Sequence, residues 1–575
     1  MHRWLGFIVA SVAGLLLAVL ATTPPAPVPA SAGPERFSAG RAMVDVQRIA
    51  AKPHPTGSAE NAEVRAYLVS RLQGLGLEVR EARAPMPERS AQRLAKWSKG
   101  TLVPTELVNI IGVLPGKDRA LPAVMLMAHH DTVWGSPGAA DDTAGVASIL
   151  EALRAITVQG QTQRDIVVLL SDAEETGLTG AKAFYADDPA RLRVGAVVNM
   201  EARGGGGRTT LFQTSRNNGN AMRLFADVAE RPGASSLAAY IYSVLPNDTD
   251  LSVTLKAGDT VSYNFAFIGR PGLYHSPKST PERLDQGALQ DMGSQVLAIT
   301  HALATAQKLP EPAPDVVFFD VFGQFMVTYP AWGGWLMIAG IVAGLGMAAK
   351  GGWAPREALR GAGRMLGLLI GTGLALFVLN RISGAGTGSN YYDRLAAIPL
   401  LEGMAALTCM AAYLLAFGKS ERSQARMVGG TGLLALLGLG AQIAAPTAAY
   451  VILWPVLLAT AALLAVGRGS GRAKWLAVAC AALAMGYLVY MGHFIMQGVG
   501  PVMPSVVALP LALVAAALLP IWPGLAARAN RNTVLALAGL ALCTALWIRL
   551  DPMADTIAVY SSDKTTPPIP ITKDH

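Results

Sequence analysis

Charged residues are scarce in this chain. Asp, Glu, Lys and Arg make up 15% of its 575 residues, whereas hydrophobic residues make up 52%. Soluble globular chains carry roughly 25% charged residues, so the composition argues against an entirely soluble protein. The length also exceeds what a single hydrophobic core normally serves. We therefore expect at least two domains, one of them in a membrane.

Cysteine is scarce as well. The three cysteines, Cys409, Cys480 and Cys543, lie inside apolar runs, where no disulfide framework or CxxC metal site can be read. The formal net charge of +8 does not indicate nucleic-acid binding, because much of the Lys and Arg of the C-terminal half lies in short loops between apolar runs. The sequence therefore predicts no nucleic-acid partner.

Residues 1–33 are expected to form an N-terminal anchor or signal segment with a linker. The residues from Trp4 to Ala21 are apolar, follow His2 and Arg3, and lead into a Pro/Ala-rich stretch. This pattern fits a signal peptide cleaved at Ala30-Ser31-Ala32, or an uncleaved anchor. An apolar run of roughly 18 residues can span a bilayer, which favours the anchor.

Residues 34–320 show short β-rich runs that alternate with helical periodicity. We expect strands at 123–128, 165–170, 194–200 and 261–268, and helices at 143–154, 178–186 and 285–308. Such alternation is typical of an α/β domain. The predicted fold of this domain is α/β hydrolase-type, with a mixed β-sheet flanked by helices.

Eight apolar stretches follow Tyr329 and predict an all-α, polytopic transmembrane bundle of about eight helices over residues 321–550. The stretches cover 331–348, 365–380, 395–417, 428–445, 449–466, 475–497, 502–522 and 533–548. The break at 445–449 is the weakest boundary, because Pro446 could kink one long helix instead of separating two.

Lys and Arg concentrate in every second loop of this bundle. The odd-numbered loops hold Lys350, Arg356, Arg360, Arg364, Lys419, Arg422, Arg426, Arg468, Arg472, Lys474, Arg528 and Arg531, whereas the even-numbered loops hold only Arg381 and Arg394. Short cytoplasmic loops are enriched in Lys and Arg. We therefore expect a multi-pass integral membrane protein whose α/β domain and tail, residues 551–575, lie on the extracytoplasmic side, periplasmic or lumenal. Arg3 indicates the same orientation.

Residue types that bind metals follow the expected strands. The first strand leads into His129-His130-Asp131 and then Asp141-Asp142, the second into Glu174-Glu175, the third into Glu201, and the last into His275. Open α/β sheets place their sites at these strand ends. Two imidazoles with several carboxylates and no thiolate suit two zinc ions bridged by one carboxylate. Such a pair shares a hydroxide and polarises a carbonyl, while a free carboxylate moves the proton.

Each of these residues also has a simpler interpretation. His275 could be an ordinary loop histidine. Glu174-Glu175 could offset a helix dipole, and Asp141-Asp142 could cap a helix. These interpretations are independent of one another. All of them would have to hold at once at the ends of neighbouring strands. A single metal site explains all of these residues together, so we favour the metal site.

The motifs around these residues resemble peptidase family M28, the di-zinc aminopeptidases. This resemblance is carried by His129-His130-Asp131, Asp141-Asp142-Thr143-Ala144-Gly145, and Glu174-Glu175-Thr176-Gly177-Leu178 with Gly180-Ala181. Further motifs resemble the vacuolar and endoplasmic-reticulum membrane protease branch, which also joins such a domain to a multi-span region. They are Pro53-His54-Pro55, Gly57-Ser58, Asn61, Asn109-Ile110, Glu201-Ala202-Arg203-Gly204, Asp248-Thr249-Asp250 and Tyr274-His275-Ser276. The resemblance implies a zinc-aminopeptidase-like fold.

The resemblance also implies a role for each residue. His129, Asp141 and Glu201 would hold one Zn²⁺, and Asp141, Glu175 and His275 the other, giving two Zn²⁺ per chain with Asp141 as the bridge. Glu174 would be the general base, Asp131 would orient His129, and Tyr274 would donate to the oxyanion. The implied function is a membrane-bound zinc peptidase, with aminopeptidase activity as the leading expectation. Glu201 stands where soluble aminopeptidases of the family commonly have Asp.

Two other functions stay open. The domain could be a non-catalytic M28-like receptor or binding domain, although every expected ligand position is filled. The chain could be a transporter with an accessory hydrolase domain. Such a protein would carry several charged residues within its spans, whereas we find only Glu402 and His493 there. The expected partners are a peptide substrate and the lipid bilayer, and the sequence sets no oligomeric state.

Overall fold

The computed structural model describes residues 3–245, 247–258, 260–350, 353–386, 391–421, 423–467 and 471–551. The predicted tail beyond residue 551, and Arg422 and Arg468 of the predicted loops, lie outside the described residues. The chain divides into two compact units. One contains Thr23–Thr328, and the other contains the described residues of Met1–Thr22 and Tyr329–Met553.

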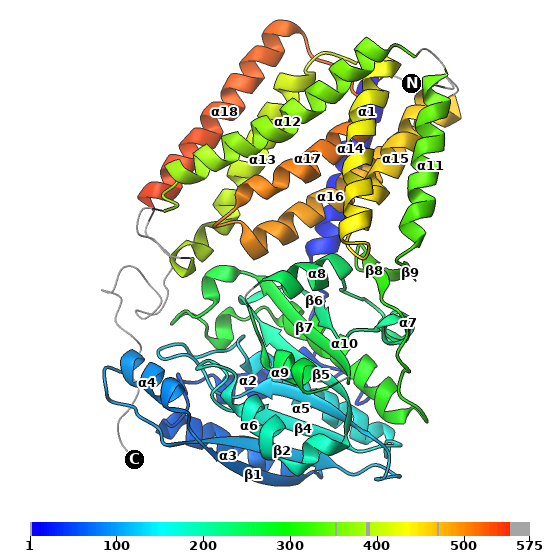
Figure 1. Ribbon diagram of the computed structural model, residues 1–575. Helices are drawn as coiled ribbons and strands as arrows, with labels where there is room; N and C mark the ends of the chain where they lie inside the picture. Colours follow the sequence, from blue (N-terminus) through cyan, green and yellow to red (C-terminus); the bar gives the residue numbers. More distant parts are fainter. Residues whose placement is uncertain are drawn as a thin grey trace. The chain divides into compact units, whose positions relative to one another are not determined.

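The first unit is built on a mixed seven-stranded sheet with the strand order β1-β2-β4-β3-β5-β7-β6 (Figure 1). The strands are β1 (Glu78–Pro85), β2 (Glu106–Leu114), β3 (Ala123–His129), β4 (Ile166–Ser171), β5 (Val194–Ala202), β6 (Gly206–Thr214) and β7 (Val261–Gly269). The strands β4, β3, β5 and β7 run parallel, and β1, β2 and β6 pair antiparallel with their neighbours. Every residue of β3 and β4 is buried, as expected for parallel strands covered on both faces.

Helices cover both faces of this sheet. One face packs against α2 (Ala39–Ile49), α3 (Ala59–Gly74), α5 (Thr143–Gln159), α7 (Gly219–Val228) and α10 (Gln286–Thr305). The other face packs against α6 (Thr179–Asp187) and α9 (Asp250–Ala257). The unit also contains α4 (Glu88–Trp97), α8 (Ser236–Val244) and a small sheet of β8 (Val316–Val321) and β9 (Phe325–Pro330). The mixed sheet flanked by helices matches the predicted architecture.

The four predicted strands are confirmed as β3, β4, β5 and β7, with ends shifted by one or two residues. The predicted helices are present too, although α5 is longer and α10 shorter than expected. The unit begins before the predicted boundary at residue 34, because the Pro/Ala-rich linker packs on it. The backbone N–H of Val28 donates to Gln290 Oε1 at 3.0 Å, and the Ser38 hydroxyl donates to the Val28 carbonyl at 3.0 Å.

The second unit is all-helical. It contains α1 (Arg3–Thr22), α11 (Gly333–Ala349), α12 (Pro355–Ile382), α13 (Ile398–Phe417), α14 (Gln424–Ala444), α15 (Tyr450–Gly467), α16 (Gly471–Val499), α17 (Ala508–Leu518) and α18 (Ala527–Leu550). Within the described residues, seven helices are long and apolar enough to cross a membrane, and Gly333–Ala349 and Pro504–Leu518 are shorter. Because α14 ends at Ala444, Pro446 lies between two helices and is not a kink.

Glu402 and His493, the residues singled out within the predicted spans, contact each other. Glu402 on α13 lies 3.1 Å from His493 Nδ1 on α16, and Gln497, one turn further along α16, donates to Glu402 at 2.7 Å. A carboxylate inside a membrane bundle is costly unless it is paired. These hydrogen bonds therefore explain how α13 accommodates Glu402.

Candidate metal centre

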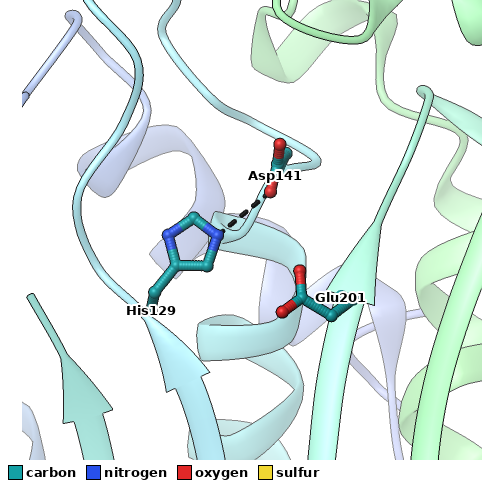
Figure 2. A group of neighbouring side chains, drawn as sticks. All are labelled: His129, Asp141 and Glu201. Carbon is teal, nitrogen blue, oxygen red and sulfur yellow. Dashed lines mark hydrogen bonds and ion pairs between the residues drawn. The ribbon is translucent and has the colours of Figure 1, made fainter. Parts of the chain in front are cut away.

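Neighbouring parallel strands bring the first two predicted ligands together. His129 is the last residue of β3, and Glu201 lies near the end of the adjacent strand β5. Met127 pairs with Asn199 in register, so His129 and Glu201 follow at the same level and on the same face. Figure 2 shows both side chains directed toward Asp141, which lies in the loop before α5.

Asp141 lies between the two predicted histidine ligands. Its Oδ1 is 3.1 Å from His129 Nε2, and its Oδ2 is 3.2 Å from His275 Nε2. His275 Nε2 is also 3.2 Å from Glu175 Oε2. The two oxygens of one carboxylate thus face two different imidazoles, which is the arrangement that a bridging ligand requires.

The donor atoms form groups that fit metal ions. In His129, Asp141 and Glu201, and again in Asp141, Glu175 and His275, one ligand atom per residue lies within 4.8 Å of the others. His129 with Glu174 and Glu175 forms a third such group. Imidazole nitrogens and carboxylate oxygens are ligands that zinc accepts. The residues present therefore fit the metal that the sequence predicts.

Electrostatics at this centre also favour cations. Burial raises the pKa of Glu174 and of Glu201 well above the usual range, and the neighbouring carboxylates add to it. Burial would raise the pKa of Asp141 too, but hydrogen bonds to His129 and His275 lower it to about 2. Burial would lower the pKa of His275, but the charge of Glu175 and the bond to Asp141 raise it to about 9. The centre thus contains more carboxyl groups than positively charged side chains, and this surplus favours the binding of cations.

Asp131 contacts both His129 and the turn that carries Glu174 and Glu175. Its backbone carbonyl is 3.0 Å from His129 Nδ1, and its Oδ1 is 3.4 Å from the same nitrogen. Its carboxylate also accepts the backbone N–H of Glu174 at 3.0 Å and that of Glu175 at 3.4 Å. One buried carboxylate therefore fixes the His129 ring and the turn that carries both glutamates.

The turn after β4 is not the first turn of a helix. The helix α6 begins at Thr179 with Leu178 as its N-cap, and its first turn contains no acidic residue. Helix-dipole effects fall off within the first turn. The helix-dipole interpretation of Glu174 and Glu175 is therefore wrong. Ala173 and Leu178, on either side of the pair, both have left-handed backbone conformations, with φ of 58° and 59°.

The adjacent residues Asp141 and Asp142 differ in their contacts, whereas the sequence left open which of them caps the helix. Asp142 is the N-cap of α5, and its Oδ1 accepts the backbone N–H of Gly145 at 3.2 Å. Its Oδ2 accepts the N–H of His129 at 3.3 Å. The helix-cap interpretation is thus correct for Asp142, whereas the Asp141 carboxylate faces His129 and His275.

Residues of the predicted N-terminal motif hold the strand ends in place. The Thr56 hydroxyl donates to Asp172 Oδ1 at 2.7 Å, and the His54 backbone N–H donates to the Thr132 hydroxyl at 3.0 Å. His130 points away from the metal ligands, with Nε2 3.1 Å from the Val108 carbonyl. His130 therefore ties β3 to β2.

Tyr274 lies beside the second predicted histidine. The two rings are stacked, with centroids 3.8 Å apart and an interplanar angle of 21°. His275 itself has a left-handed backbone conformation, with φ of 49°. Such strain in a non-glycine residue persists where the surrounding structure holds it, and it is common at functional sites.

Asp250 is a buried acid near the centre to which the sequence assigns no role. It lies at the start of α9, and its Oδ2 accepts a short hydrogen bond from Ser171, the residue that pairs in register with His129. Burial raises the pKa of Asp250 to about 6. The Asp248-Thr249-Asp250 motif was the only sequence signal for this residue.

Part of this chain is similar to known proteins. Residues 109–300 match peptidase family M28. The chain is 31% identical over 251 residues to endoplasmic reticulum metallopeptidase 1 of Homo sapiens, a match that covers 42% of this chain and 28% of that protein. It is 29% identical over 308 residues to the vacuolar membrane protease of Eremothecium gossypii, covering 50% and 29% respectively. The matched region is thus less than a third of either relative.

Two solved structures are similar to about half of this chain. The aminopeptidase from Aneurinibacillus sp. strain AM-1 is 15% identical with a TM-score of 0.37, over 49% of this chain and 97% of that one. The zinc aminopeptidase BSAP from Bacillus subtilis is 15% identical with a TM-score of 0.39, over 48% and 98%.

Proposed function

We propose that this chain, whose residues 109–300 form a domain of peptidase family M28, is a membrane-bound zinc peptidase. The observation that carries the proposal is the position of Asp141, whose two carboxylate oxygens face His129 and His275. His129, Asp141 and Glu201 would hold one zinc ion, and Asp141, Glu175 and His275 the second. The zinc pair would lower the pKa of water and polarise the scissile carbonyl.

Glu174 is the proposed general base. It is half-buried, lies near His129, and makes no direct ion pair with either histidine among the described residues, in contrast to Glu175. The carboxylate would take a proton from the attacking water as the new C–O bond forms. It would then give that proton to the leaving nitrogen as the C–N bond breaks, so that the products are an amine and a carboxylate.

Asp131 and Tyr274 are proposed to support this step. Asp131 would fix the tautomer and orientation of His129 through the contacts to its Nδ1, as carboxylates behind metal-binding histidines do. Tyr274 would donate its hydroxyl hydrogen to the developing oxyanion. Its ring stacks on His275, which places the phenol beside the proposed second zinc site.

Peptides with a free N-terminus are the proposed substrates. An aminopeptidase-like cleavage agrees with the M28 match and with the proposed pair of metals. Glu201 reaches one methylene further than Asp, so the space that holds the substrate's amine is expected to differ from that of soluble relatives. The proposed location of the domain is the extracytoplasmic side of a membrane. The human relative carries the endoplasmic reticulum in its name, and the fungal relative the vacuolar membrane.

A digest with the purified full-length protein tests this proposal. We expect about two zinc ions per chain and cleavage of peptides with a free N-terminus, both lost on treatment with a chelator and restored by zinc. N-terminally acetylated copies of the same peptides are the matched control, and their cleavage should be much slower. Equal rates for free and acetylated peptides would remove the aminopeptidase assignment. A zinc-loaded protein that cleaves neither set would favour a receptor or transporter.

A further inference from the structure

The helix α4 carries three basic side chains that take no part in the proposed mechanism. Arg89, Arg93 and Lys96 follow one another at spacings of four and three residues, which places them along one side of the helix. We call these three residues the basic stripe. Arg89 and Lys96 are exposed, and Arg93 is half-buried. None of the three side chains forms an ion pair or a hydrogen bond with any residue that the structure describes. Their charges are therefore available to a bound anion.

The sheet places α4 at the edge that carries the proposed metal ligands. The helix joins the end of β1 to the start of β2 (Figure 1). Because β2 runs antiparallel to β4, the start of β2 lies beside the end of β4. The backbone N–H of Val108 there donates to Asp172 Oδ2 at 2.9 Å, and the turn with Glu174 and Glu175 follows directly. The helix α4 therefore lies on the β2 side of the metal centre.

Direct contacts fix α4 on that turn. The buried Ser90 hydroxyl donates at 3.2 Å to the carbonyl of Thr176, which follows the two glutamates. Leu94 packs in one apolar cluster with Ala173, which precedes them. Arg93 lies three positions after Ser90 and is therefore its neighbour on the helix surface. The basic stripe thus adjoins the residues through which α4 contacts the metal centre.

We infer that the basic stripe binds acidic side chains of the peptide substrate, on the C-terminal side of the scissile bond. The inference rests on the proposed function, in which the substrate's amine lies near Glu201 on β5. In the strand order β2-β4-β3-β5, α4 lies at the opposite side of the metal centre from β5. A peptide whose amine is held at β5 can therefore extend across the zinc pair toward α4. The substrate class is a peptide with a free N-terminus and carboxylates further along its chain.

The dimensions of a helix and of an extended peptide set which substrate residues the stripe can contact. A helix with its side chains is about 10 to 12 Å across, and an extended peptide covers about 3.3 Å per residue. Because α4 contacts the turn that carries Glu175, the stripe can reach residues roughly three to five positions beyond the scissile bond. Guanidinium and ammonium groups bind carboxylates through charge-assisted hydrogen bonds. The contact with this turn favours a peptide over a lipid surface as the occupant.

The test compares cleavage of the peptides Leu-Ala-Ala-Glu-Glu-Glu and Leu-Ala-Ala-Gln-Gln-Gln by the full-length protein in nanodiscs of neutral phosphatidylcholine. An exposed ion pair changes affinity by up to about fivefold. We therefore expect the wild type to cleave the acidic peptide with a kcat/KM roughly 5- to 30-fold higher, mainly through a lower KM. This preference should fall at high salt. In the stripe variant, which combines Arg89→Gln, Arg93→Gln and Lys96→Gln, the two peptides should be cleaved with similar kcat/KM.

A second variant with the same change in net charge is the matched control. It removes three exposed cations that make no ion pair with a described residue and that follow the ends of β2, β6 and α10, at the opposite edge of the sheet. Its substitutions are Lys117→Gln, Arg216→Gln and Lys308→Gln. This variant should keep the wild-type preference for the acidic peptide.

Equal kcat/KM of the wild type for the two peptides, or a preference that persists in the stripe variant, would overturn the inference. Loss of the preference in the control variant would also overturn it, because net charge and not the stripe would then be the cause. Attachment of wild-type but not stripe-variant nanodiscs to vesicles that contain phosphatidylglycerol, with an unchanged peptide preference, would assign the stripe to lipid instead. A wild type that cleaves neither peptide would contradict the proposed function. Calorimetry with the same peptides then decides on the stripe, because tighter binding of the acidic peptide supports it and equal binding overturns it.

Discussion

Glu174 and Glu175 are adjacent in sequence but have different side-chain surroundings. Glu175 Oε2 is 3.2 Å from His275, whereas Glu174 lies near His129 and forms no direct ion pair among the described residues. We predict that Glu174→Gln keeps both zinc ions and lowers turnover by about 10² to 10⁴, because the amide keeps the shape but removes the base. Glu175→Gln should instead lose one zinc ion, with activity that partly returns in excess zinc.

Metal analysis and steady-state kinetics on both variants distinguish these roles. Asp188→Asn is a suitable control, because Asp188 lies outside the centre and pairs with Arg80. Full activity of Glu174→Gln with both metals bound would contradict the proposed mechanism. If Glu174→Gln lost zinc and Glu175→Gln retained it, Glu174 would be the metal ligand and Glu175 the general base.

Asp250 gives a prediction on pH-dependent stability. Its pKa is raised to about 6 in the folded protein from 3.8, so the folded state favours the neutral acid. The stability due to this group is therefore fully present below about pH 4 and is lost as pH rises through about 6. The charges of His129, Asp131 and Lys182 also act on this carboxylate. Asp250→Asn keeps an acceptor for Ser171 and cannot ionise.

In the metal-free protein, Asp250→Asn should raise the free energy of unfolding by about 2 to 3 kcal/mol at pH 8, and by well under 1 kcal/mol at pH 4, where the carboxyl is protonated in the folded state. Melting temperatures of variant and wild type at the two pH values measure this difference. An equal shift at both pH values would mean that packing, and not ionisation, separates the two proteins.

At the level of single residues, sequence motifs predicted the ligand set but not the contacts that hold it. His129, Asp141, Glu175, Glu201 and His275 all come together as expected. The different roles of Asp141 and Asp142 could not be read, because both precede a helix and only the fold decides which carboxylate turns back to cap it.

At the level of elements, hydrophobic runs predicted four buried strands, whereas the two edge strands, β1 and β6, and the buried interior strand β2 were missed. β1 is Glu-Val-Arg-Glu-Ala-Arg-Ala-Pro, with no buried residue, because it pairs only with β2. β6, at the other edge, contains Arg208 and several Thr residues. Periodicity detects strands that are buried on at least one face. Strands whose apolar content is low can be assigned only from their neighbours.

The helix α1 is packed closely on α16, and we predict that it stays attached to the mature protein. A Cβ atom at Gly486 would lie 2.8 Å from Leu17 Cβ and 3.1 Å from the Gly14 carbonyl oxygen. Gly486→Leu should therefore separate the two helices and destabilise the bundle by about 1 to 3 kcal/mol. Gly492→Leu is the matched control on the same helix, because no atom lies within 4 Å of its added Cβ.

Thermal unfolding in detergent measures the difference between these variants, and intact-mass measurement tests whether residues 1–33 are retained. The candidate cleavage site lies in a segment that packs on the folded unit, since Arg41 donates to the carbonyls of Ala30 and Ala32 at 2.8 and 3.0 Å. A mature chain that begins near residue 33 would contradict the prediction, as would equal melting temperatures for the two leucine variants.

At the level of the whole molecule, helix packing and loop charge indicate the same orientation of the helical unit in the membrane. Gly14 of α1 lies against Met485 and Gly486 lies against Leu17, so α1 runs parallel to α16. Arg472 and Lys474 lie at the start of α16. The first residues of α1 are therefore at the Lys- and Arg-rich end of the bundle, and Thr22 is at the other end.

The cations at that other end are few, and two of them, Arg394 and Arg549, are hydrogen-bonded to the protein. Arg394 is buried, and its guanidinium donates to Asn380 Oδ1 at 2.9 Å and to the Ser383 carbonyl at 3.1 Å. Arg549, near the end of α18, donates to the Ile382 carbonyl at 3.4 Å. Both contacts tie the end of α12 to its neighbours.

These arrangements predict that residue 575 is extracytoplasmic and that the loop between α17 and α18, which precedes Arg528 and Arg531, is cytoplasmic. Alkaline phosphatase, which folds to its active form only after export, should be active when fused after residue 575 and inactive when fused after Ala526. A cytoplasmic reporter such as β-galactosidase should give the opposite pair of results. Because the two fusion points differ by the single helix α18, each is the control for the other. Phosphatase activity after Ala526, with none after residue 575, would reverse the predicted orientation and put the proposed peptidase unit, Thr23–Thr328, in the cytoplasm.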